Sequence, residues 1–347
     1  MKKIRALILS CLACALGRQP VAGQNITAAE AWNTGAFFNQ GRPVFAMRSR
    51  PKSKQEDKIF LYVKNYLKDS GVPEDFIKAA FELQGGRVNK KILDRFRKPG
   101  KIKKKGQLPR KFVEAGAQFY LANEKLLEDL RADYGLDPLI LTSLVGIETF
   151  YGDFHGEFGV FDALYTAAKA IPKRSQWASR ELAALLIYCY ANDLALKWKY
   201  GYQAPANEIQ GSYAGAFGYG QFLPSSFNRF AVDRDADGLK DPYSWPDTLA
   251  SVSNYLVAHG YDKNSLDFSK GSKNWKALYA YNHSDAYVRS ILDLREEIRK
   301  KLGLPDPLVP SQKKKARAKT RTSLEDLKSW PWVETKIADE AETDDEE

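Results

Sequence analysis

One carboxylate stands inside the most apolar stretch of the sequence. Residues 139–156 read LILTSLVGIETFYGDFHG, and Glu148 is the first charged residue in this run. An ionised carboxylate is costly in apolar surroundings unless it is paired, so this position favours a neutral carboxylic acid with a raised pKa. Such an acid suits general acid catalysis near neutral pH. The alternative is a glutamate that turns toward solvent at a helix end, and this stretch alone does not decide between the two.

The pair Asp137-Pro138 predicts where the helix that carries Glu148 begins. Asp is a preferred N-cap, and Pro is a preferred first helical residue. We expect Gly152 to end the helix. Glu148 follows Leu144 by four residues and therefore shares its face. Both this apolar face and the negative end of the helix dipole disfavour ionisation of the carboxyl, so the expected pKa shift is upward.

Two further segments combine polar and aromatic side chains. Residues 209–227 read IQGSYAGAFGYGQFLPSSF and contain four glycines together with Ser212 and Gln221. Glycines allow a backbone to approach a ligand closely, and aromatic faces stack on flat partners such as sugar rings. A glycine-rich turn packed under a core is the alternative. The segment 278–288, LYAYNHSDAYV, adds three ring and amide side chains: Tyr281, Asn282 and Tyr287.

The motifs GIETFYG, GSYAGAFGYGQFLPSSF and YN, in this order, resemble those of the lytic murein transglycosylases typified by membrane-bound lytic transglycosylase B. The resemblance covers residues 130–300 well and residues 57–130 loosely. It implies a mainly α fold, with a lysozyme-like catalytic core, an accessory N-terminal helical domain and an EF-hand-like loop. It also implies Glu148 as the single catalytic acid and base. The substrate-binding residues that it implies are Ser212, Gln221, Tyr281, Asn282, Tyr287 and Trp177, the last in place of a tyrosine.

The resemblance implies a reaction that needs only one acid. Protonated Glu148 would cleave the β-1,4 bond between N-acetylmuramic acid and N-acetylglucosamine in peptidoglycan. The ionised Glu148 would then take the proton of the sugar's C6 hydroxyl, which closes a 1,6-anhydro ring without water. Ser212 and Asn282 are expected to orient the acetamido group and to hydrogen-bond Glu148. The interval between Glu148 and Ser212 is about ten residues longer than in relatives, which places an insertion around residues 195–208.

Two other functions stay open at this point. A hydrolytic muramidase normally needs a second carboxylate about 5 to 9.5 Å from the first. Asp153 and Asp162 are the nearest candidates, but Asp153 follows Gly152 in a turn and Asp162 resembles a helix N-cap. The other alternative is a non-catalytic peptidoglycan-binding protein that retains the cleft.

The stretch DRDADGLKDPYSWPD predicts a structural Ca²⁺ site. Its acidic residues follow the one-three-five spacing of an EF-hand loop, with a turn glycine and a carbonyl ligand behind them: Asp233, Asp235, Asp237, Gly238 and Leu239. Ser244 stands where an EF-hand has its twelfth-position Glu, and the resemblance implies that Asp247 closes the loop instead. A solvated acidic turn is the alternative. No organic cofactor is expected, and the three histidines, His155, His259 and His283, lack metal-ligand spacing.

Charge and composition bound the remaining possibilities. The 347 residues are 44% hydrophobic, which indicates a globular protein, and the formal net charge of +10 favours polyanionic partners. The N-terminus has basic residues, a short apolar stretch and small residues, which is typical of an export signal. An exported, periplasmic protein at the cell envelope meets peptidoglycan rather than nucleic acid. With the signal removed, Cys189 is alone, and its apolar neighbours predict a buried thiol.

The chain divides by composition and periodicity into five predicted parts. They are a signal peptide (1–23), a linker or arm (24–56), an accessory helical domain (57–130), the catalytic core with its calcium loop (131–305) and a disordered charged tail (306–347). The tail is first basic and then acidic, and we expect it to recruit an envelope or cell-wall protein. Apolar periodicity predicts helices within residues 56–71 and 72–83, and one longer helix over residues 112–135.

Overall fold

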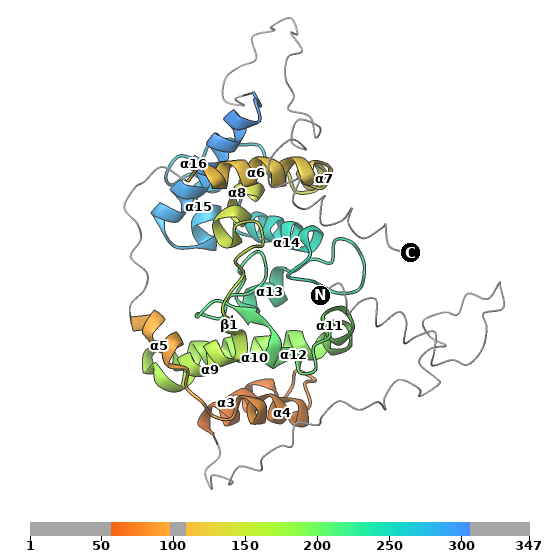
Figure 1. The fold of residues 1–347 in the computed structure, drawn as a ribbon, viewed down its shortest axis with the longest axis vertical. Helices are drawn as coiled ribbons and strands as arrows, with labels where there is room; N and C mark the ends of the chain where they lie inside the picture. Colours follow the sequence, from red (N-terminus) through yellow and green to blue (C-terminus); the bar gives the residue numbers. More distant parts are fainter. Residues whose placement is uncertain (1–56, 98–108, 306–347) are drawn as a thin grey trace, which may run out of the picture. The chain divides into compact units, whose positions relative to one another are not determined.

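The protein is described by a computed structural model over residues 57–97 and 109–305. All of these residues belong to one compact unit that begins at Gln55. The export signal, the arm and the charged tail predicted from the sequence lie outside the described residues. Within the described ranges the fold is mainly helical, as predicted (Figure 1). The two short strands there, β1 (Phe158–Gly159) and β2 (Gln210–Gly211), pair antiparallel.

The helices follow one another in this order: α3 (Lys58–Leu67), α4 (Glu74–Gln84), α5 (Lys90–Arg97), α6 (Arg110–Ala122), α7 (Glu124–Tyr134), α8 (Pro138–Thr149), α9 (Val160–Ala170), the 3-10 turn η1 (Pro172–Arg174), α10 (Ser175–Ala191), α11 (Asp193–Tyr200), α12 (Pro205–Glu208), α13 (Pro224–Phe230), α14 (Trp245–Ala258), α15 (Lys273–Tyr281) and α16 (Asp285–Lys301). Helix α10 contacts α9, α3 and α13, whereas α8 contacts α16, α6, α7 and α14. The β1–β2 pair lies between these two groups of helices (Figure 1).

Helix α8 begins where the sequence predicted. The Asp137 side chain accepts a hydrogen bond of 2.8 Å from the backbone N–H of Leu139, and Pro138 is the first helical residue. The predicted end at Gly152 is wrong, because Phe150 already adopts a left-handed conformation with φ of 50°. The chain turns early because Tyr151 packs its ring against α6 and α8. Its hydroxyl donates to the carbonyl of Phe112 over 3.3 Å.

The predicted helix over residues 112–135 is also wrong in its continuity, because the structure divides it into α6 and α7. Asn123 separates the two helices with φ of −116° and ψ of 17°. Its side-chain amide donates to the carbonyl of Phe119 over 2.9 Å. An asparagine side chain that competes for a helical carbonyl in this way weakens the helix locally. The apolar periodicity of the sequence does not reveal this break, because apolar residues recur at helical spacing on both sides of it.

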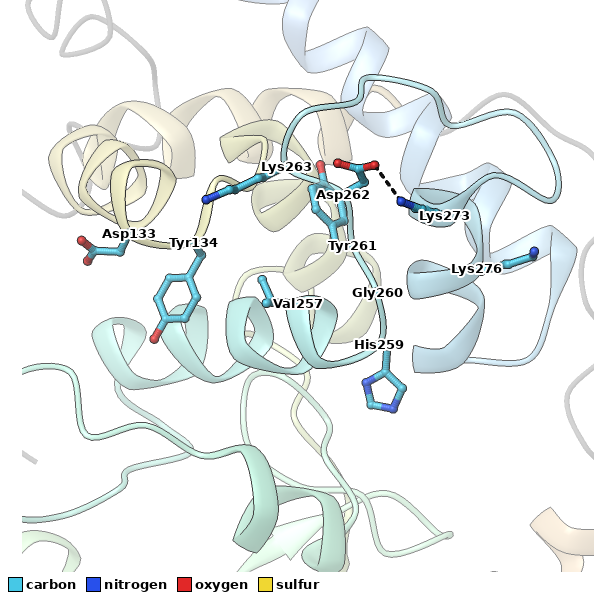
Figure 2. Close-up of a pocket in the computed structure, with 10 residues that line it drawn as sticks. All are labelled: Asp133, Tyr134, Val257, His259, Gly260, Tyr261, Asp262, Lys263, Lys273 and Lys276. Atoms are coloured by element: carbon cyan, nitrogen blue, oxygen red, sulfur yellow. Dashed lines mark hydrogen bonds and ion pairs between the residues drawn. The ribbon is translucent and has the colours of Figure 1, made fainter.

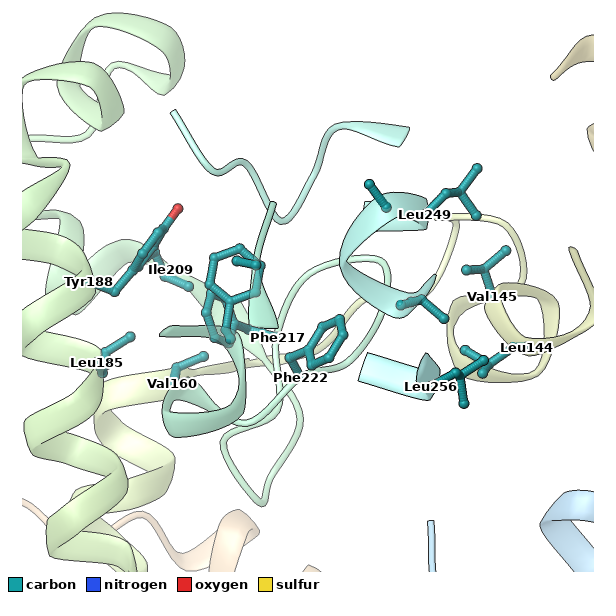
Figure 3. Packing of buried hydrophobic residues seen from close by; sticks show 14 of the residues in the cluster. Leu144, Val145, Val160, Leu185, Tyr188, Ile209, Phe217, Phe222, Leu249 and Leu256 are labelled. Atoms are coloured by element: carbon teal, nitrogen blue, oxygen red, sulfur yellow. The ribbon is translucent and has the colours of Figure 1, made fainter. Parts of the chain in front are cut away.

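One continuous hydrophobic core connects the helices. It runs from Ile59 of α3 to Ile298 of α16 and includes Cys189, whose thiol is buried as predicted. Figure 3 shows Leu144 and Val145 of α8 in the same cluster as side chains from α10, α14 and the glycine-rich segment. Because α8 is buried along nearly its whole length, the position of Glu148 is fixed by packing on several sides.

In residues 57–97 and 109–305, no helix has both the length and the apolar composition that a membrane crossing requires.

Candidate active site

Glu148 lies in the last turn of α8, where a phenol from another helix meets it. The hydroxyl of Tyr287, in the first turn of α16, donates a hydrogen bond of 2.5 Å to Glu148 Oε1. Burial raises the pKa of Glu148 from 4.5 to about 7, although the Tyr287 hydrogen bond opposes the increase. The carboxyl thus retains its proton close to neutral pH, as the sequence predicted.

A second phenol borders the same carboxyl. Burial and the nearby Glu148 hold the pKa values of Tyr281 and Tyr287 well above 10, so both phenols stay protonated when Glu148 ionises. The hydroxyl of Tyr281 donates to the carbonyl of Gly220 over 2.6 Å. Tyr287 is therefore the phenol whose proton serves Glu148, and Tyr281 ties α15 to the glycine-rich segment.

Ser212 has a different set of partners from those expected. Its hydroxyl oxygen accepts hydrogen bonds from the backbone N–H groups of Ala214 and Ala216, over 3.3 and 3.1 Å. Asn282 is exposed at the C-terminal end of α15. The hydrogen bond to Glu148 that the sequence assigned to Ser212 and Asn282 comes from Tyr287 instead, because α16 packs alongside α8.

The glycine-rich segment forms one wall of a cavity of about 330 Å³. Ser212 and Gln221 line it together with residues 153–158 of the turn after α8. The Gln221 side-chain amide donates to the carbonyls of His155 and Gly218, over 3.1 and 2.9 Å. The structure thus places two of the predicted substrate-binding residues together, close to the end of α8.

The close fit of this wall depends on a glycine. Gly156 has a φ of 135°, and a Cβ atom built there would lie 2.1 Å from the backbone carbon of Gly211. Any side chain at Gly156 would therefore push the turn after α8 away from β2. This contact holds the turn and the glycine-rich segment side by side.

Several residues of this cavity were not singled out from the sequence. His155, Arg95 and Tyr213 line it. His155 reaches the cavity because its Nδ1 lies 3.0 Å from the carbonyl of Gly152. The motif GDFHG, residues 152–156, contains His155 and was the sequence signal that could have identified it.

The aromatic wall continues beyond the cavity. Phe96 of α5 packs edge-on against Tyr213, with ring centroids 5.0 Å apart. The guanidinium of Arg174 lies over both Phe96 and Trp177, at 5.2 and 5.6 Å from the ring centroids. Trp177 is partly exposed. Through Arg174, the rings of Trp177 and Phe96 therefore form one surface at this side of the cavity.

The carboxylates that a hydrolytic mechanism would use are placed differently from Glu148. Asp153 is exposed in the turn after α8. Asp162 lies in the first turn of α9, whose N-cap is Gly159, so the expectation that Asp162 is itself the N-cap is wrong. In the part of the chain that the structure describes, the side-chain hydrogen bond to Glu148 comes from the phenol of Tyr287 rather than from a second acid.

The acidic loop brings three of its five predicted ligands together. One carboxylate oxygen from each of Asp233, Asp235 and Asp237 lies within 4.8 Å of the others. Asp233 Oδ1 is buried and has no hydrogen-bond partner, which is unusual for a carboxylate. An oxygen left without a partner and two adjacent carboxylates fit a hard cation such as Ca²⁺.

Asp247 and Leu239 have other contacts. Asp247 is buried, and its two oxygens accept the backbone N–H groups of Arg234 and Asp241, over 2.7 and 2.8 Å. It thus joins the two sides of the loop. The N–H of Leu239 donates to Asp237 Oδ1 over 2.9 Å.

A lysine from α11 faces the same loop. Lys199 Nζ lies 2.9 Å from Asp237 Oδ2 and 2.9 Å from Asp241 Oδ2. Asp241 is 1% exposed and also accepts hydrogen bonds of 2.7 and 2.6 Å from the hydroxyl of Tyr200. Lys199 and Tyr200 belong to the stretch where the sequence suggested an insertion. That stretch packs against the acidic loop.

A larger cavity of about 620 Å³ lies elsewhere, between the end of α7 and the segment after α14 (Figure 2). Lys263, Lys273 and Lys276 are among its lining residues, and Lys273 pairs with Asp262 over 3.2 Å. Figure 2 shows Lys263 and Lys276 pointing toward opposite sides of the cavity. Because its cationic groups diverge, this cavity has no convergent set of polar groups like that around Glu148.

Comparison with known proteins identifies the class to which this fold and site belong. The family model of the transglycosylase SLT domain matches residues 55–270, so the chain belongs to that family. A curated relative, membrane-bound lytic murein transglycosylase B of Escherichia coli (strain K12), is 35% identical over 151 residues. The match covers 44% of this chain and 39% of the relative.

Solved structures share the fold. Soluble lytic transglycosylase SltB1 of Pseudomonas aeruginosa has a TM-score of 0.61 at 24% identity, over 71% of this chain and all of that one. SltB3 of the same organism, in complex with NAG-anhNAM-pentapeptide, has a TM-score of 0.58 at 22% identity, over 69% of this chain and 78% of that one. Escherichia coli lytic transglycosylase Slt35, in complex with calcium, has a TM-score of 0.55 at 20% identity, over 76% and 99%.

Proposed function

We propose that this protein is a lytic transglycosylase that cleaves peptidoglycan between N-acetylmuramic acid and N-acetylglucosamine and leaves a 1,6-anhydromuramic acid end. The observation that carries the proposal is the Glu148 carboxyl, whose pKa of about 7 arises from burial beside one neutral phenol. A single acid with this pKa donates a proton readily and accepts one again within the same cycle. Family membership and the NAG-anhNAM-pentapeptide held by SltB3 support the same assignment.

The site geometry indicates how Glu148 serves both steps. Oε1 accepts the Tyr287 hydrogen bond, so the acidic proton resides on Oε2. From there it passes to the glycosidic oxygen as the bond to the anomeric carbon breaks, while the substrate's acetamido oxygen stabilises that carbon. The Tyr287 hydrogen bond favours the resulting carboxylate. Glu148 then removes the proton of the C6 hydroxyl, whose oxygen bonds to the anomeric carbon.

The substrate-binding residues form the second part of the proposal. Ser212 and Gln221 line the cavity, Tyr281 and Tyr287 border the carboxyl, and Trp177 offers an aromatic face for a sugar ring. Asn282 is exposed at the end of α15, beside Tyr281, where it is available to a glycan. We assign residues 57–130 to an accessory helical domain and residues 131–305 to the catalytic core.

A hydrolytic muramidase is the competing function. It requires a second carboxylate at a separation of about 5 to 9.5 Å from the first. In the described ranges, the side chain that hydrogen-bonds Glu148 is the Tyr287 phenol, and burial is the main cause of the raised pKa of Glu148. The exposed position of Asp153 also favours the transglycosylase.

Ca²⁺ is proposed as a structural ion of the acidic loop. Asp233, Asp235 and Asp237 would hold it, with the Leu239 carbonyl and Asp247 completing the set. The buried, unpartnered Asp233 Oδ1 supports this proposal, as does the calcium complex of Slt35. The bound ion would supply positive charge that joins the loop to the start of α14, and it takes no part in the chemical steps.

Location and partners follow from the same substrate. Peptidoglycan glycan strands are the proposed ligand, and the basic balance of +10 suits an acidic cell wall. The predicted export signal supports a periplasmic location at the envelope. The charged tail, residues 306–347, is the proposed contact for an envelope protein.

The test is mass spectrometry of the soluble products that the purified protein releases from peptidoglycan. We expect muropeptides that end in 1,6-anhydromuramic acid, and none with the Glu148→Gln variant. Glu128→Gln, at an exposed glutamate of α7 outside the cavity, serves as the matched control and should release the same products as the wild type. Reducing ends would favour the muramidase, and binding to peptidoglycan without products would favour the non-catalytic alternative.

A further inference from the structure

Helices α8 and α16 touch through polar groups at two places. At one place, Tyr287 of α16 donates to Glu148 in the last turn of α8. At the other, Arg295 of α16 binds Asp137, the N-cap of α8, with Nε 2.6 Å and Nη2 2.5 Å from Oδ2. The first turn of α16 thus meets the last turn of α8, and a later turn of α16 meets the start of α8. The two helices therefore run antiparallel.

The ion pair at the second place is largely shielded from solvent. The side chains of Arg295 and Asp137 are 11% and 12% exposed. The guanidinium also lies over the ring of Phe268, 5.5 Å from its centroid. Removing one partner of such a pair leaves an uncompensated buried charge, so the pair strongly favours one alignment of the two helices.

The rest of the contact between the two helices is apolar, and apolar contacts are not directional. The buried face of α16 consists of Val288, Ile291, Leu294 and Ile298, and α8 is apolar on nearly every side. Close packing resists a slide of the two helices, and the polar pair adds a preference for one alignment, because only that alignment brings its two charged groups together. A slide of one residue along a helix axis moves a side chain by about 1.5 Å, which would break the hydrogen bond between Tyr287 and Glu148.

We propose that Arg295 and Asp137 are positioning residues, which fix the alignment of α16 on α8 so that the hydroxyl of Tyr287 stays bonded to Glu148. The inference rests on the proposed function for its catalytic meaning, because the bond serves the reaction only if Glu148 is the acid. Arg295 lies eight residues beyond Tyr287, or about 12 Å along the helix. It therefore acts through the helix rather than on the substrate.

The sign of the expected effect separates this role from a direct charge effect. In the described ranges, the titratable groups that face Glu148 are the phenols Tyr281 and Tyr287, which stay protonated as Glu148 titrates. Replacing Asp137 by Asn removes a negative charge, which acting directly would lower the pKa of Glu148. Losing the Tyr287 hydrogen bond raises that pKa instead. Asn remains a good N-cap, so α8 can still begin at the same residue.

The experiment measures the pKa of Glu148 in the full chain by NMR of ¹³C-labelled glutamate carboxyls. The signal is assigned by its absence from Glu148→Gln. Asp137→Asn should raise the pKa by roughly half a unit or more, as expected when a hydrogen bond to the ionised form is lost. Lys300→Met, at an exposed residue near the end of α16, should leave it unchanged.

A second background makes the test decisive. Tyr287→Phe alone should raise the pKa of Glu148 at least as much as Asp137→Asn, and adding Asp137→Asn to Tyr287→Phe should produce no further increase. A downward shift with Asp137→Asn, or an equal upward shift in both backgrounds, would overturn the positioning role. Because this measurement needs no substrate, it is independent of the proposed activity, which the anhydromuramic products test separately.

Discussion

Glu148 and Asp237 are carboxylates in opposite electrostatic surroundings. Glu148 is partly buried beside phenols at the end of an apolar helix, and burial raises its pKa to about 7. Asp237 is 39% exposed on its loop, and the hydrogen bond from Lys199 holds its pKa below the usual value. The same chemical group is thus prepared to exchange a proton at one place and to remain an anion at the other. The difference arises from the neighbours that packing supplies.

The comparison is tested most strongly at Glu148 itself. Glu148→Gln keeps the shape of the side chain but cannot donate or accept the proton. We expect the initial rate of peptidoglycan solubilisation to fall by about 100- to 10,000-fold, the range typical of a general acid and base. Glu128→Gln, at an exposed residue of α7, should keep the wild-type rate. Equal losses in both variants would show that the distinction between the buried and exposed carboxyls is wrong.

Glu148→Gln should be more stable than the wild type at high pH. Between pH 4.5 and about 7 the unfolded chain ionises Glu148 while the folded protein keeps its proton, so the wild-type free energy of unfolding falls as pH rises. Glutamine avoids this loss, which amounts to at most about 3 kcal/mol above pH 7. Urea unfolding of both proteins at pH 5 and pH 8 measures it. A difference between the two proteins that stays constant with pH would contradict the raised pKa.

The acidic loop should make the stability of the protein depend on a bound cation rather than on pH. Ca²⁺ at a hundredfold excess over its dissociation constant should raise the free energy of unfolding by about 2.7 kcal/mol. Asp233→Asn should remove most of this gain, because it alters the buried oxygen that has no partner. The control is Asp69→Asn, at an exposed residue of the same chain. Thermal melts with Ca²⁺ and with a chelator compare the three proteins. If Ca²⁺ stabilised Asp233→Asn as much as the wild type, the loop would not be the Ca²⁺ site.

The smallest expected effect concerns Lys199. Its ammonium neutralises Asp237 and Asp241 when no other cation is bound, so Lys199→Met should lower stability in chelator by about 1 kcal/mol. Removing a positive charge beside the loop should also tighten Ca²⁺ binding, which calorimetry measures. Lys197→Met is the matched control, because Lys197 pairs with Asp193 on the same helix. If both variants had the same stability in chelator and the same Ca²⁺ affinity, Lys199 would have no specific effect on the loop.

Local signals in the sequence predicted the parts of the site that depend on near neighbours. Asp137 and Pro138 marked the start of α8 because capping involves adjacent residues. The end of α8 was missed, since Phe150 and Tyr151 adopt left-handed conformations to pack against α6, which no local propensity favours. The break at Asn123 was missed for a similar reason, because apolar residues recur at helical spacing on both sides of it.

The sequence alone determined which carboxylates stand in apolar and acidic surroundings, namely Glu148 on its helix and Asp233, Asp235 and Asp237 on their loop. Only the tertiary structure decided which groups meet them. Tyr287 reaches Glu148 across 139 residues of chain, and Lys199 reaches Asp237 across 38. Such partners depend on how α16 and α11 pack, because a hydrogen bond forms only when separate elements place donor and acceptor within about 3 Å.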